Sequence, residues 1–216
     1  MSFIPYNDRY IPEDSPAQCA QDFYEVMKKR RSVRHFSNRP VERETIEWLV
    51  RVACSAPSGA NRQPWRFVCV RDPAVKKKIR LGAEGEEQKF YEERASDRWL
   101  EDLEKFGTGP QKPYLETAPW LIVVFRLIRG DSDEQVYYTR ESVGLATGML
   151  LAAAQHAGLS TLTHTPSPMK FLSETLERPD HEKPYLLIPV GWPADDCEVP
   201  ASASKRRPLE ESAIFI

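Results

Sequence analysis

The spacing of apolar residues along the chain predicts a series of amphipathic helices. Ile46, Leu49, Val50 and Ala53 follow the i, i+3, i+4, i+7 spacing with which a helix buries one face. The same reasoning predicts helices over about residues 20–27, from Pro40 to residue 54, from Asp72 onward, from about Tyr137 to His156, and over Met169–Leu176.

Continuous apolar runs predict the strands. Trp120–Phe125 is apolar at every position, so both faces of this strand should be buried. Further strands are predicted at Trp65–Val70, Leu159–His164 and Pro184–Val190. The 216 residues suffice for one large domain. We therefore expect an α+β (α/β-type) fold with a central mixed sheet surrounded by helices.

Three segments depart from this pattern and set the expected domain organisation. Residues 1–19 lack periodicity and predict an extended N-terminal arm, which leaves 20–216 as one domain. Residues 82–116 are so highly charged that they should bury little, as an exposed helical hairpin or a mobile cover. The tail 192–216 ends in the apolar residues AIFI, which favours an added strand on a sheet edge of its own or of a partner chain.

The charge balance and the cysteine spacing argue against several classes of protein. The 30 basic and 32 acidic residues nearly balance, which argues against a broad surface for nucleic acid or membrane. The four cysteines are scattered without metal-ligand spacing, so we expect reduced thiols and no metal. No signal peptide is evident and the apolar runs are too short to span a bilayer, so we expect a cytoplasmic protein without membrane association.

Candidate chemistry lies in four short polar stretches. The run 28–36, KKRRSVRHF, groups arginines and a serine as an anion site would, although a solvated helix end would carry the same charges. The loop 56–64 could offer backbone donors or could be a plain connector, and 163–165 could be donors or ordinary strand residues. With the basic residues 205–207, these stretches suit a phosphorylated aromatic cofactor such as FMN. No Ser-His-Asp elbow, Walker loop or GxGxxG motif supports a hydrolase or a nucleotide triphosphatase.

The stretches KKRRSVRHF, APSGANRQPW, TLTHTP, PVGWP and KRRPLEE occur in an order that resembles the nitroreductase superfamily, in particular its iodotyrosine deiodinase branch, over about residues 20–216. The resemblance implies that the FMN phosphate and the pyrimidine edge of the ring are held by the first of these stretches and by the tail. Pro57 and Ser58 would meet the flavin from the neighbouring side. Thr163 would lie at flavin N5 as the catalytic group, followed by His164 and Thr165. The implied phosphate and ring-edge contacts are Arg30, Arg31, Ser32, Val33, Arg34 and Arg206.

The same resemblance implies that the charged residues 82–116 are an insertion that forms an active-site lid. It implies that Glu87 pairs with the ammonium of an amino-acid substrate while Tyr91 and Lys112 hold its carboxylate. The backbone N–H of Ala60 would meet the phenolate oxygen. We expect no membrane anchor of the kind that the animal enzymes of this branch carry, and His164 stands where those enzymes usually have threonine.

These observations predict an FMN-dependent reductive dehalogenase of halogenated tyrosines, in which the flavin passes electrons to the halophenol. The alternative is a broad NAD(P)H-dependent nitroreductase or quinone reductase, in which the insertion is only a cover. A basic-patch binding module without FMN is the third reading. The expected reductant is NAD(P)H or a flavin or iron–sulfur reductase, and the expected assembly is a homodimer.

Overall fold

The computed structural model describes residues 2–216, and its contacts divide the chain into two compact units with the boundary after Arg30. The first unit contains helix α1 (Pro16–Met27). Ser15 caps this helix by accepting a hydrogen bond from the N–H of Gln18 at 3.2 Å, and Pro16 occupies its first turn. The predicted helix before the basic run is therefore confirmed, but it begins inside the predicted arm 1–19.

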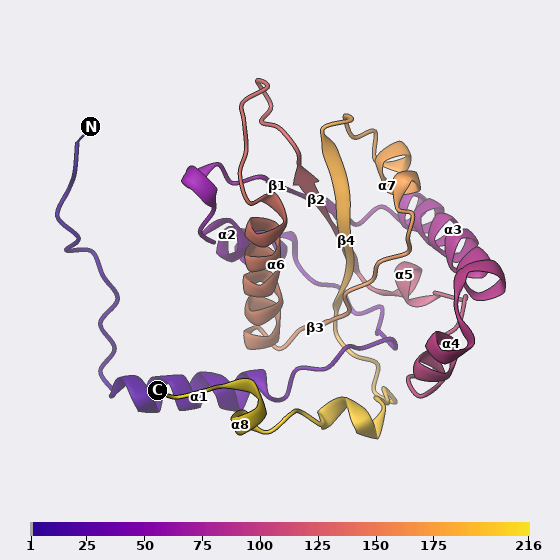
Figure 1. Ribbon diagram of the computed structural model, residues 1–216. Coiled ribbons are helices and arrows are strands. Elements are labelled where there is room, and N and C mark those ends of the chain that lie inside the picture. The colour runs from indigo at the N-terminus through magenta and orange to yellow at the C-terminus, as the bar shows by residue number, and fades with distance from the viewer. Residues whose placement is uncertain (1) are drawn as a thin grey trace. The chain divides into compact units, whose positions relative to one another are not determined.

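The second unit is built on a four-stranded sheet with the order β1-β2-β4-β3 (Figure 1). Its ladders are antiparallel, and within the described chain the parallel pairing is one isolated bridge between Ser32 and Thr161. The third strand is shorter than predicted, because the chain leaves the ladder after Thr161 and rejoins β4 only at His164. The strands are β1 (Trp65–Val70), β2 (Trp120–Leu127), β3 (Ser160–Thr161) and β4 (Glu182–Gly191).

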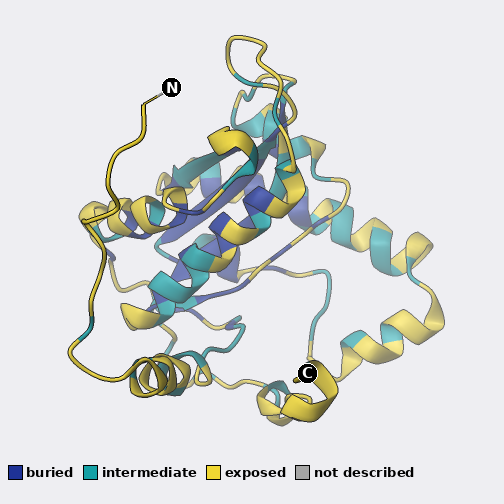
Figure 2. Cartoon of the chain, turned by 60° about the vertical axis from the view of Figure 1, so that its left-hand side comes forward, coloured by how far each residue is buried: buried dark blue, intermediate teal, exposed yellow. Residues whose placement is uncertain are grey.

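The central strand β2 is buried on both faces, as its continuous apolar run predicts. Alternate side chains enter two separate cores, because successive residues of a strand point to opposite faces. Ile122 and Val124 belong to one core, and Leu121, Val123 and Phe125 belong to the other. Figure 2 shows this sheet buried between helices whose outer surfaces are exposed.

Helices cover both faces of the sheet and bury the expected apolar stripes. Helices α2 (Arg43–Cys54) and α6 (Thr139–His156) contribute to the first core, where Ile46, Leu49 and Ala53 are buried as predicted. Helices α3 (Pro73–Lys89), α5 (Tyr114–Thr117) and α7 (Lys170–Thr175) contribute to the second. The Asp72 side chain caps α3 by accepting from Val75 N at 2.9 Å.

The charged segment 82–116 is helical, but it buries more than its composition predicts. Helix α3 runs into one π-helical turn at Phe90–Arg94, and Ser96 then caps α4 (Asp97–Glu104), which has no buried residue. The exit of the segment differs, since Lys112, Tyr114 and Leu115 are buried. A lysine can be buried here because the fold supplies carbonyl and carboxylate partners.

The C-terminal tail forms no strand within the part of the chain that is described. It contains a short 3₁₀ turn, Ala201–Ser204, and helix α8 (Leu209–Ser212). The prediction that the tail adds a strand to the chain's own sheet is therefore wrong, whereas its pairing with the sheet of a second chain stays a prediction. Across residues 2–216, no helix is both long and apolar enough to cross a membrane.

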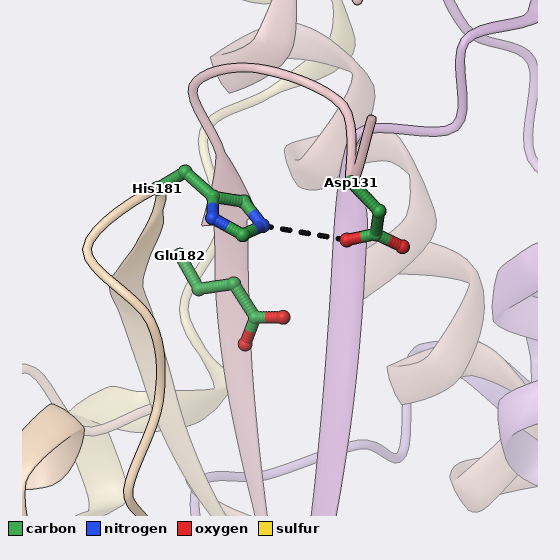
Figure 3. A group of neighbouring side chains, drawn as sticks. All are labelled: Asp131, His181 and Glu182. Carbon is green, nitrogen blue, oxygen red and sulfur yellow. Dashed lines mark hydrogen bonds and ion pairs between the residues drawn. The ribbon is translucent and has the colours of Figure 1, made fainter. Parts of the chain in front are cut away.

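A charged network ties β1, β4 and the loop after β2 together. Glu182 is 1% exposed and accepts from Arg178 at 2.6 and 2.9 Å and from Arg66 at 3.0 Å. Asp131 accepts from Arg66 at 2.7 and 2.8 Å and lies 3.3 Å from His181 (Figure 3). Asp131, His181 and Glu182 bring ligand atoms within 4.8 Å of one another. Two guanidinium groups already neutralise both carboxylates, so the cluster acts as a structural brace.

Candidate active site

A cavity of about 500 Å³ lies between the end of α3, the π-helical turn, α4 and the segment that follows β3. Its wall brings together residues that are distant in the sequence, from Arg34 to Ser167. The predicted site residues on this wall are Arg34, Glu87, Tyr91, Lys112, Thr163, His164 and Thr165. The cavity therefore gathers the lid and much of the predicted cofactor site in one place.

An ion pair between Glu87 and Lys112 lies at the centre of the lid. Lys112 Nζ is 3.0 Å from Glu87 Oε2, and the two side chains are 6% and 14% exposed. Lys112 also donates from Nζ to the carbonyl of Gly109 at 2.6 Å, while its backbone N–H donates to Glu84 Oε1 at 2.6 Å. A negative and a positive group with little exposed surface are thus held side by side, an arrangement that suits the two charges of a zwitterion.

Tyr91 adds a hydroxyl to this pair. It follows Glu87 by four residues across the junction of α3 and the π-helical turn, and both side chains line the cavity. Its hydroxyl lies 3.0 Å from the Thr108 hydroxyl. The predicted grouping of Glu87, Tyr91 and Lys112 is therefore found in the structure, whereas their roles toward a substrate stay predictions.

An aromatic and apolar wall, which was not predicted from the sequence, completes the lid side of the cavity. The rings of Phe90 and Trp99 meet edge to face with centroids 4.9 Å apart, and Leu103 and Tyr114 also line the space. The signal was the i, i+4 spacing of Trp99 and Leu103 within a segment otherwise rich in charge. Such residues can enclose an aromatic ligand.

The second half of the basic run is an extended segment attached to the sheet. Val33 N donates to the carbonyl of Thr161 at 3.2 Å, and Ser37 N donates to that of Trp192 at 2.9 Å. Arg34, between them, is half-buried and lines the cavity. Its guanidinium has no hydrogen bond or ion pair to any other residue from 2 to 216. A solvated helix end is therefore the wrong description of Arg34, and an unneutralised arginine at a cavity wall suits an anionic ligand.

The side chains of Thr163, His164 and Thr165 alternate between exposed and buried, and all three line the cavity. His164 is buried and pairs with Leu187 through two backbone hydrogen bonds of 2.9 Å, while Thr163 and Thr165 are exposed on either side of it. Burial, together with the positive charges of Lys112 and Arg34, lowers the pKa of His164 to about 3. The imidazole is therefore neutral at neutral pH.

The remaining predicted residues do not line this cavity. Ser58 holds its own loop by accepting from Gln63 N at 2.9 Å, and Ala60 has the left-handed φ of 50°. In the tail, Arg206 donates to the carbonyls of Ala203 and Lys205, each at 2.8 Å. Ser32 and Val33 reach the site only through their backbone pairing with Thr161. Pro57 belongs to the same loop as Ser58, and Arg30 and Arg31 stand at the boundary of the two units.

Comparison with known proteins places this arrangement in a family. The nitroreductase family model matches residues 27–192. An iodotyrosine deiodinase from Haliscomenobacter hydrossis is 52% identical over 204 residues, covering 92% of this chain and 91% of the relative. The human iodotyrosine deiodinase 1 is 44% identical over 220 residues, covering 99% of this chain and 75% of the relative.

Structural similarity agrees with these matches. A crystal structure of oxidized iodotyrosine deiodinase bound to FMN and 3-iodo-L-tyrosine has a TM-score of 0.75 and 32% identity, and the match covers 90% of this chain and 97% of that one. Fold and sequence both lead to one assignment. The chain belongs to the nitroreductase family, in its iodotyrosine deiodinase branch.

Proposed function

We propose that the chain is an FMN-dependent reductive dehalogenase acting on halogenated tyrosine. The observation that carries the proposal is the ion pair between the buried Lys112 and the partly buried Glu87, with Tyr91 on the same cavity wall. A general reductase of nitroaromatics has no need for opposite charges held together in its substrate site. The similarity to iodotyrosine deiodinases over most of the chain supports the same substrate class.

The amino-acid group of the substrate would separate Glu87 from Lys112 and pair with both. Its ammonium pairs with Glu87 while its carboxylate pairs with Lys112 and accepts from the Tyr91 hydroxyl. One protein ion pair is thereby replaced by two contacts between protein and substrate, so neither charge is left unpaired. The halophenol ring lies against the aromatic wall formed by Phe90 and Trp99.

The cavity suits the electron-rich edge of a flavin ring, because Arg34 is an unneutralised cation on the wall that also carries the exposed Thr163 and Thr165. When bound, FMN supplies the two electrons that, with one proton, convert the carbon–halogen bond into a carbon–hydrogen bond and release halide. We assign Thr163 as the hydroxyl donor at flavin N5, next to His164 and Thr165. The phosphate and the ring edge are assigned to Arg30, Arg31, Ser32, Val33, Arg34 and Arg206.

A homodimer would explain why part of the proposed site lies outside the cavity of one chain. Pro57, Ser58 and Ala60 do not line the cavity that contains Glu87 and Thr163. We propose that a second copy brings this loop to the site, so that the Ala60 N–H can donate to the phenolate oxygen. The tail 192–216 would pair with the partner's sheet, consistent with its lack of a strand here. The reductant, NAD(P)H or a reductase, and a cytoplasmic location are also parts of this proposal.

Purified protein tests the proposal directly. We expect a visible flavin absorption spectrum, and we expect 3-iodo-L-tyrosine to quench the fluorescence of the bound flavin. Lys112→Ala should abolish the quenching while retaining flavin. A coloured protein that turns over nitroaromatics with NAD(P)H but neither binds nor dehalogenates iodotyrosine would instead support the broad nitroreductase. A colourless protein that does not take up FMN would contradict both.

A further inference from the structure

The imidazole of His164 is buried with one nitrogen that has no hydrogen-bond partner, and a contact to the cofactor does not explain this. The residue is 8% exposed. Its Nε2 is the one fully buried side-chain nitrogen or oxygen, from residue 2 to the C-terminus, that lacks a hydrogen-bond partner. Such an atom destabilises the folded state unless a ligand or a rearrangement gives it a partner. The partner should therefore be sought among the groups that face the ring.

Glu87 is the acceptor that faces Nε2. Its Oε1 lies 3.9 Å from His164 Nε2, which is too far for a hydrogen bond, while its Oε2 is 3.0 Å from Lys112 Nζ. The imidazole and the ammonium thus flank one carboxylate. The histidine backbone is fixed by its two bonds to Leu187, and its ring meets Tyr114 edge to face at 6.3 Å. A small movement of Glu87 toward the fixed imidazole would close the gap.

The charges around the ring determine what it can offer. The ring faces the Glu87 carboxylate and the Tyr114 ring, and the positive charges of Lys112 and Arg34 act on it. The two cations and the burial keep the imidazole neutral, so it can donate one proton without adding a charge. A neutral donor can hold Glu87 while leaving its negative charge available to an ammonium group.

We propose that His164 is a positioning residue for Glu87, which takes over the carboxylate when a zwitterionic substrate draws Lys112 away. The Nε2–H then donates to Glu87 Oε1 and holds the carboxylate toward the substrate ammonium. This inference rests on the proposed function and deepens it, because it assigns to His164 a share in selecting the amino-acid group. An uncharged halophenol leaves the Glu87–Lys112 pair intact and therefore gains nothing from His164.

Three variants test whether the Nε2–H of His164 is the donor to Glu87. His164→Gln places an amide N–H near the position of Nε2, His164→Asn places one near Nδ1, and His164→Leu removes the donor. Binding of 3-iodo-L-tyrosine and of uncharged 2-iodophenol to the FMN-loaded variants is measured by calorimetry. FMN content and thermal melting are measured beside it.

We expect His164→Leu and His164→Asn to bind iodotyrosine at least about tenfold more weakly, as for loss of a hydrogen bond to a charged group. His164→Gln should stay within about threefold of the unmodified protein, and 2-iodophenol should bind all four proteins alike. Equal weakening of both ligands, loss of FMN, or the same affinity in all variants would overturn the inference. If His164→Leu does not fold, the contrast between His164→Gln and His164→Asn decides. Failure of the unmodified protein to bind iodotyrosine would instead refute the proposed function.

Discussion

The backbone N–H of Val33 donates to the carbonyl of Thr161 at 3.2 Å, which joins two segments that are far apart in the sequence. This contact sets Arg34 on the same cavity wall as Thr163. An arginine-rich stretch and a threonine-rich strand end thereby form one polar surface. The cofactor part of the proposed site depends on this junction.

The role of Arg34 can be tested through FMN content. Arg34→Ala should weaken FMN binding by about tenfold or more, because a charge-assisted contact to an anion is lost. The ratio of flavin to protein absorbance after purification measures this. Arg129→Ala is the matched control, since Arg129 is exposed and pairs with Asp133 in its own loop. Equal flavin content in both variants would exclude Arg34 from the FMN site.

The Glu87–Lys112 pair should behave as a unit. Lys112→Met leaves the partly buried Glu87 carboxylate without its cation, and we expect this to lower the free energy of unfolding by about 3 kcal/mol. The double variant Glu87→Gln/Lys112→Met should recover part of that loss while still failing to bind iodotyrosine. Urea unfolding without FMN of the unmodified protein, of Lys112→Met and Glu87→Gln singly, and of the double variant gives the coupling energy. Strictly additive losses would show that the two side chains do not interact.

Acid sensitivity should trace in part to Glu182. Burial alone would raise the pKa of this carboxyl, but hydrogen bonds from Arg178 and Arg66 outweigh it and lower the pKa. Its contribution to stability is therefore present above the pKa of the unfolded chain, about 4.3, and is lost as pH falls through the lower folded value. Glu182→Gln should cost about 2 kcal/mol at pH 7 and much less near pH 3. Exposed Glu198→Gln is the control, and parallel pH profiles for Glu182→Gln and the unmodified protein would contradict the prediction.

Two glycines offer a matched test of the loop that carries Ala60. A methyl group at Gly59 would lie 2.8 Å from Tyr138 Cδ2, whereas one at Gly85 in α3 would meet nothing within 4 Å. Gly59→Ala should therefore lower the melting temperature and displace the loop. Gly85→Ala should stabilise the protein by up to about 1 kcal/mol through helix propensity. Thermal melting compares them, and similar effects of the two changes would show that Tyr138 does not brace the loop.

The catalytic assignment of Thr163 needs a comparison with its neighbour. Thr163 and Thr165 are both exposed on the cavity wall, on either side of His164. If Thr163 supplies the hydroxyl at flavin N5, Thr163→Ala should slow dehalogenation of iodotyrosine by about tenfold or more with little change in its affinity. Thr165→Ala should have a smaller effect. The reverse order in single-turnover rates would move the role to Thr165.

Local patterns predicted most of the fold, because the strands and helices follow from periodicity and capping. The run at Trp120–Phe125 and the stripe at Ile46 and Ala53 needed no tertiary knowledge. The extent of β3 and the burial of Lys112 could not be predicted in this way. They depend on partners distant in sequence, such as Glu87 and the β4 edge.

Sequence motifs predicted which residues belong to the candidate site, but they did not predict how those side chains contact one another. The resemblance gave Glu87, Tyr91 and Lys112 together, and the structure brings them to one cavity. It gave no indication that His164 would turn toward Glu87, since that depends on how β4 fixes the His164 backbone. Nor did it reveal the wall formed by Phe90 and Trp99, because a charged segment conceals its few apolar residues.

We propose that electrons from bound FMN remove halogen from a tyrosine held by Glu87 and Lys112. The most direct test is an anaerobic single turnover, in which the purified protein is reduced chemically and mixed with one equivalent of 3-iodo-L-tyrosine. We predict reoxidation of the flavin with release of about one iodide and one tyrosine per flavin, and no release from Lys112→Ala under the same conditions. A flavin that stays reduced, with iodotyrosine recovered unchanged, would contradict the account.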